Sequence, residues 1–103
     1  MFVKLNLQFY IFIAEMELVA VHALQPGEAR EAALRQAVQI LNYEWPRSDT
    51  IRRRGLKSSS AGLPSHLLLL QGDRVLGHAR ISKIPADNSK IFIESVVVHP
   101  QLR

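Results

Sequence analysis

Apolar residues recur at three- and four-residue spacing between residues 27 and 44, while Arg30, Glu31, Arg35 and Gln39 fall between them. This period is typical of an amphipathic helix with one buried face. Pro26 lies where a helix can begin, and Pro46 disfavours helical geometry in the residue before it. The pattern therefore predicts a helix over about 27–44 whose apolar face is formed by Ala29, Ala33, Leu34, Ala37, Val38, Ile40, Leu41 and Trp45.

Shorter apolar runs elsewhere predict strands. Gln71-Gly72-Asp73 is a turn signal between two of these runs and predicts a β-hairpin. Residues 46–65 are polar, and we expect either a loop or a short second helix followed by a loop. A second loop is expected at 85–88, and Pro100 ends the last strand. The predicted strands are 16–24, 67–70, 74–81 and 90–99.

The predicted order is strand, helix, loop and three strands, without an internal repeat. It indicates the α+β class, with a mixed or antiparallel sheet covered by the amphipathic helix. The 103 residues suffice for one domain, and 48% of them are hydrophobic, as in globular proteins. Residues 1–15 form an apolar extension that matches a signal peptide poorly, because Asn6 and Gln8 interrupt it. We therefore expect a cytoplasmic protein that does not enter a membrane.

The net charge of +4 is concentrated in one segment. Residues 47–57 carry five cations and one acid, so the remaining residues are neutral in sum. A local basic segment favours a specific acidic partner, or a solvated loop, over a general nucleic-acid surface. No aromatic residue alternates with these arginines, which also disfavours single-stranded nucleic acid.

Two classes of site are disfavoured by residue type. The chain has no cysteine, which excludes disulfides, thiolate metal ligands and a cysteine nucleophile. The histidines lack the short spacing of metal ligands on one element, so we expect no metal site. These histidines are His22, His66, His78 and His99.

The last strand continues as Glu94-Ser95-Val96-Val97-Val98-His99-Pro100-Gln101-Leu102-Arg103. Together with the predicted order of elements, this strand resembles the first half of a domain of the GNAT acetyltransferase superfamily. Two shorter segments resemble the N-alpha-acetyltransferases of that superfamily that act on processed actin. They are Asn42 to Ser48, which ends in Trp-Pro-Arg-Ser, and Gly77 to Ser82. The resemblance implies that 16–103 is the N-terminal two-thirds of a GNAT domain, truncated before the loop that binds the pyrophosphate of acetyl-CoA.

The resemblance also implies roles for individual residues. Acetyl-CoA would be the co-substrate, held by Val96, Val97 and Val98 and by Arg103 at the start of the phosphate loop. Without the rest of that loop, we expect the 103 residues to bind acetyl-CoA poorly and to turn over slowly. Glu94 is the candidate general base, and strand alternation predicts that it shares a face with Val96 and Val98.

The acidic amino terminus of actin would be the substrate, and profilin is a possible second partner. The resemblance places the substrate-binding residues in the basic segment, because arginine pairs well with carboxylates. Trp45 would supply an apolar wall, although its spacing also fits a core residue. The implied substrate-binding residues are Trp45, Thr50, Ile51, Arg52 and Arg53.

Two alternatives remain open from the residues. One is a non-catalytic module that binds acidic protein termini through its arginine-rich segment, without acetyl transfer. The other is a nucleic-acid-binding fragment, whose affinity would fall steeply with salt.

Overall fold

The computed structural model describes residues 15–103 and has the predicted α+β architecture. Four antiparallel strands form one sheet in the order β1-β2-β3-β4, and two helices complete the fold. The proposed extension lies outside the described residues, apart from Glu15. The elements are β1 (Met16–Ala20), η1 (Val21–Ala23), α2 (Glu28–Glu44), α3 (Asp49–Lys57), β2 (Ser65–Gln71), β3 (Arg74–Ile84), β4 (Asp87–Val98) and η2 (Pro100–Leu102).

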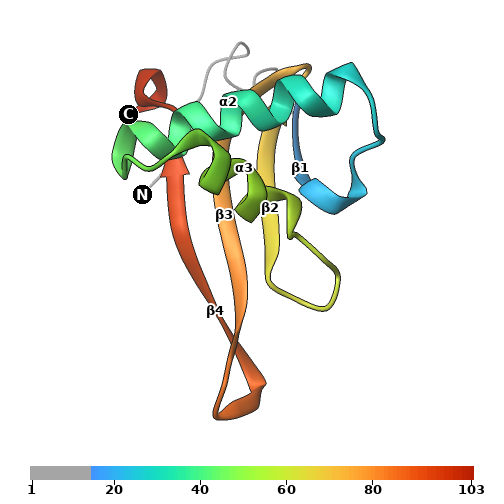
Figure 1. Ribbon diagram of the computed structural model, residues 1–103, viewed down its shortest axis with the longest axis vertical. Helices are drawn as coiled ribbons and strands as arrows, with labels where there is room; N and C mark the ends of the chain where they lie inside the picture. Colours follow the sequence, from blue (N-terminus) through green and yellow to red (C-terminus); the bar gives the residue numbers. More distant parts are fainter. Residues whose placement is uncertain (1–14) are drawn as a thin grey trace, which may run out of the picture.

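The two helices lie on the same face of the sheet, with α2 crossing the strands and α3 beside it (Figure 1). The predicted helix is confirmed almost to its bounds. Its apolar face packs on the sheet, where Leu34 and Leu68 are both fully buried at the centre of the core. Neither helix is long and apolar enough to cross a bilayer, and the same holds for every helix within residues 15–103.

The segment between α2 and β2 contains the short second helix that the sequence left open. Ser48 caps α3, because its hydroxyl accepts a hydrogen bond of 3.1 Å from the backbone N–H of Ile51. Asp49 lies in the first turn and Lys57 in the last, which suits the helix dipole. The first strand is shorter than predicted, since it ends at Ala20 and continues as η1.

The hairpin of β3 and β4 is long and extends beyond both helices (Figure 1). The strands are joined by a turn at Pro85 and Ala86, which is shorter than the expected loop. Because no helix covers the tip, Ile91 and Ile93 are exposed despite their apolar side chains.

A β-bulge in β4 changes which side chains share a face. Arg80 is opposite Glu94 and His78 is opposite Val97, so Ser95 and Val96 together oppose one residue of β3. Ser95 adopts a φ of 53°, in the left-handed region. Alternation therefore restarts after the bulge. The prediction that Glu94 shares a face with Val96 and Val98 is wrong, because Glu94 and Val97 lie on the helix-covered face instead.

Gly77 allows the close approach of β3 to β4 beside this bulge. A Cβ added at Gly77 would lie 3.0 Å from the carbonyl oxygen of Val97. We expect Gly77→Ala to lower the free energy of unfolding by about 1–3 kcal/mol, because the strands must move apart. Urea unfolding measures this loss. Gly55→Ala in α3 is the matched control, since a Cβ there meets open space and alanine favours a helix. Equal stability of the two variants would contradict the prediction.

Candidate functional site

A cleft of about 270 Å³ opens between α3 and the sheet, next to the bulge of β4. Its floor is formed by side chains of β2, β3 and β4, and its rim by α3 and the segment before it. The lining combines cationic and imidazole groups with a few apolar ones. The lining residues are Leu41, Arg47, Ile51, Arg52, Gly55, Ser58, His66, His78, Arg80 and Ser95.

Two buried histidines form a hydrogen-bonded chain at the floor of this cleft. Nδ1 of His66 lies 2.8 Å from Nε2 of His78, and Nδ1 of His78 lies 2.8 Å from the carbonyl oxygen of Ser95. A carbonyl can only accept, so Nδ1 of His78 carries a proton and its Nε2 accepts from His66. In the neutral pair, Nε2 of His66 is therefore an unprotonated acceptor, and it has no hydrogen-bond partner within residues 15–103.

The surroundings keep both imidazoles uncharged near neutral pH. Burial lowers the pKa of His66 to about 4, with further lowering from His78 and Arg80. Burial also lowers the pKa of His78, and this outweighs the opposite effect of its bond to Ser95. The pair therefore offers a fixed neutral acceptor beside guanidinium groups.

Arg52 is held at the rim of the cleft by the end of α2. Its Nε donates to Oδ1 of Asn42 at 3.1 Å, and its guanidinium also donates to the carbonyl of Trp45. Asn42 accepts from the backbone N–H of Arg47 as well. Burial, followed by repulsion from Arg47, lowers the pKa of Arg52 below its usual value. These contacts fix the direction of one cation at the cleft.

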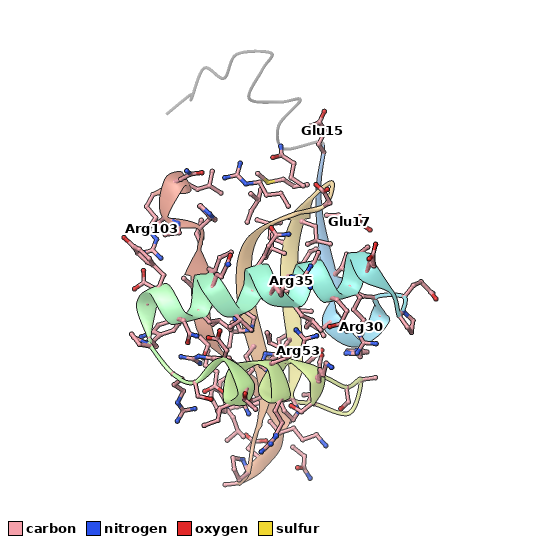
Figure 2. All side chains as sticks on the ribbon, turned by 45° about the horizontal axis from the view of Figure 1, so that its top comes forward. Glu15, Glu17, Arg30, Arg35, Arg53 and Arg103 are labelled. Atoms are coloured by element: carbon pink, nitrogen blue, oxygen red, sulfur yellow. The ribbon has the colours of Figure 1, made fainter. Side chains whose placement is uncertain are left out.

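A second hollow, of about 280 Å³, adjoins the C-terminal half of β4. Trp45, which the resemblance assigns to substrate binding, lines this hollow. The residues that the resemblance assigns to acetyl-CoA line it as well: Val96, Val97, Val98 and Arg103. Trp45 is 45% exposed, so it is a wall of this hollow more than a core residue. Arg103 pairs with Glu44 at the end of α2, and its Nε donates to the carbonyl of Val98 at 3.0 Å (Figure 2).

The expected substrate-binding residues are only partly brought together. Ile51 and Arg52 line the first cleft, and Trp45 lines the second hollow. Thr50 is exposed on α3 and lines neither. Arg53 points to the other side of α3, between the two helices, where it pairs with Glu31 (Figure 2).

The carboxylate of Glu94 already has two partners on β3. Its Oε1 lies 2.8 Å from a guanidinium nitrogen of Arg80 and accepts a hydrogen bond of 3.0 Å from the hydroxyl of Ser82. Both partners hold the carboxylate against β3. A general base at this position would have to compete with them for its lone pairs, and its catalytic role stays a prediction.

Glu94→Gln distinguishes a base from a cross-strand contact. Because the carboxylate is already paired, we expect the variant to lose up to about 1 kcal/mol of unfolding free energy and to change peptide affinity less than about threefold. Urea unfolding and peptide titration measure these quantities. Loss of acetyl transfer by about 100-fold with unchanged stability would instead assign the base to Glu94.

The sequence did not single out the histidine pair as a site. The histidines are twelve positions apart in the sequence, and this spacing does not indicate that two side chains meet on a single helix or strand. The hairpin prediction does carry a signal, since pairing about Gly72 brings residue 66 opposite the region of 78–80. The observed register pairs His66 with Arg80 and Leu68 with His78.

No family model matches the chain. A search of curated proteins finds N-alpha-acetyltransferase 80 from Mus musculus, which is 32% identical over 81 residues. The chain is related in sequence to an N-alpha-acetyltransferase. The match covers 72% of this chain and 26% of the relative, so the chain spans about a quarter of the protein it matches.

Proposed function

We propose that this chain forms part of an N-alpha-acetyltransferase of the GNAT type. It would transfer an acetyl group from acetyl-CoA to the acidic amino terminus of a protein, with processed actin as the specific substrate. The sequence relationship to N-alpha-acetyltransferase 80 is the observation that carries the proposal. The position of the two hollows supports it, since they adjoin successive residues of β4, from Ser95 to Val98.

The cationic cleft suits the acidic peptide. Arg47, Arg52 and Arg80 contribute to its lining, and Arg52 is oriented by Asn42 and Trp45. A guanidinium that is already oriented loses less side-chain entropy when it pairs with a carboxylate. This arrangement favours Asp or Glu in the first positions of a substrate over uncharged residues.

The second hollow suits an extended ligand such as the pantetheine of acetyl-CoA. β4 is an edge strand of the described sheet, so its outer edge pairs with no strand of residues 15–103. Backbone groups on such an edge can bond to the amides of an extended ligand. Val96, Val97 and Val98 would hold the co-substrate there, which supplies the activated acetyl group, and Arg103 lies beside them.

The test uses two peptides that differ only in charge, one beginning Asp-Asp-Asp and one beginning Asn-Asn-Asn. Each is incubated with the chain and acetyl-CoA, binding is followed by NMR titration, and acetyl transfer by mass spectrometry. We expect the acidic peptide to bind about tenfold more tightly and to gain the acetyl group faster, because each carboxylate gains charged hydrogen bonds. Equal binding of the two peptides would contradict the proposal.

The same experiment addresses the second candidate, a module that binds acidic termini without catalysis. The arginine-lined cleft alone would support that function. It predicts the same preference for the acidic peptide, no effect of acetyl-CoA on peptide affinity and no acetylated product. A steep loss of affinity with salt for DNA or RNA, without a peptide preference, would instead indicate nucleic-acid binding.

A further inference from the structure

The cleft beside α3 contains one hydrogen-bonding group that an acidic side chain would not use. Nε2 of His66 is an acceptor, whereas a carboxylate needs donors. His66 is 8% exposed and is held at its backbone and at its ring. Its backbone N–H donates to Oγ of Ser59 at 2.9 Å, and its Nδ1 is bonded to His78. The lone pair of Nε2 is therefore a fixed feature of the cleft.

We propose that His66 binds the α-amine of the substrate in its uncharged form, by accepting a hydrogen bond at Nε2. The inference rests on the proposed function and names the residue that recognises the reacting group. His78 is a positioning residue, because its bond to the carbonyl of Ser95 sets the tautomer of both rings.

The charges around the cleft favour the neutral amine over the ammonium ion. Arg47 and Arg52 approach from the side of α3, and Arg80 from β3. Glu94 on β4 is the facing acid, and it is paired with Arg80. His78 is neutral, and His22 from η1 reaches the site only through Ser59. Like charges disfavour a bound ammonium, so the amine gives up its proton more readily here than in water. An uncharged amine is the nucleophilic form that acyl transfer requires.

The experiment measures how the affinity of the chain for a peptide depends on pH. The probe begins Asp-Asp-Asp with a free α-amine, and the matched peptide carries an N-terminal acetyl group. The carboxylates stay ionised between about pH 6 and about pH 8.5, whereas an α-amine with a pKa near 8 changes from charged to neutral. We expect the affinity for the free-amine peptide to rise roughly 40- to 80-fold over this interval, in proportion to the neutral fraction of the amine, and that for the acetylated peptide to stay constant.

Two variants assign the effect to His66. His66→Asn keeps a donor for Nε2 of His78 at the position of Nδ1 but has no atom at the position of Nε2, so the rise with pH should fall below about twofold. His99→Gln is the matched control, because His99 does not line the cleft and its Nδ1 accepts from the backbone N–H of Gln101, and it should keep the full rise. Persistence of the full rise in His66→Asn would overturn the proposal.

A measurement on the unchanged chain tests the proposal even if His66→Asn does not fold. The NMR signal of Nε2 of His66 should shift when the free-amine peptide binds and should stay in place with the acetylated peptide. Equal shifts with both peptides would overturn the role of His66 and leave the proposed function intact. Loss of the preference for Asp-Asp-Asp over Asn-Asn-Asn would overturn the proposed function itself.

Discussion

Replacing Arg52 with alanine is expected to weaken the binding of a peptide that begins Asp-Asp-Asp by roughly 10- to 100-fold. Arg52 lines the cleft beside α3 and is held there by Asn42 and by the carbonyl of Trp45. A hydrogen bond to a charged group contributes about 1.5–3 kcal/mol, which corresponds to this range of affinities. Titration of the peptide by NMR or calorimetry measures the effect.

Arg53→Ala is the matched control, because it removes the same charge from the next residue of α3. Arg53 pairs with Glu31 on the far side of the helix and does not line the cleft. We expect its affinity for the acidic peptide to change less than about twofold, as for an exposed surface pair. If both variants lost affinity equally, the total charge of the segment would decide binding, and the orientation of Arg52 would not.

Replacing Leu34 with alanine is expected to lower the free energy of unfolding by about 2–5 kcal/mol. Leu34 lies in the middle of α2, is 0% exposed and belongs to the central core between helix and sheet. Its truncation removes buried methyl groups and leaves a cavity that the neighbours cannot fill. Chemical unfolding in urea gives the difference, and an unchanged slope with denaturant would show that the unfolded state is the same.

Arg35→Ala controls for the effect of alanine on the helix itself. Arg35 is the next residue of α2, and its side chain is exposed. The change should lie within about 0.5 kcal/mol of zero, because no buried contact is lost. A loss below about 1 kcal/mol for Leu34→Ala would mean that α2 packs loosely on the sheet. Since small domains have a total stability of about 5–15 kcal/mol, the expected loss is a large part of it.

Local patterns predicted most of the fold, because burial in a helix or hairpin repeats at a fixed period. The helix over 27–44, the turn at Gly72 and the last strand all follow from such periods, and the structure confirms them with shifts of a few residues at most. For α3 the sequence left a loop or a helix open, because Ile51 and Leu56 are the apolar residues of that segment and do not establish a helical period. Ser48 caps the helix through a hydrogen bond whose geometry spacing alone does not predict.

The candidate site was predicted less completely. The sequence identified Arg52 through its charge, and the resemblance to a family added Ile51; the structure places both at one cleft. It also assigned Arg53 to the same group, although helical geometry turns that side chain towards Glu31. The assignment of substrate and co-substrate to these residues stays a prediction.

The sequence by itself determined the elements of this protein, its α+β class and the location of its charge. Only the tertiary structure decided which elements meet. The bulge at Ser95 places Glu94 with Val97 instead of Val96, and the register of β2 on β3 brings His66 to His78. The period of apolar residues in a segment shows which of its residues face the core and which face solvent. Contacts between segments depend on register and bulges, which are settled by packing across the whole sheet.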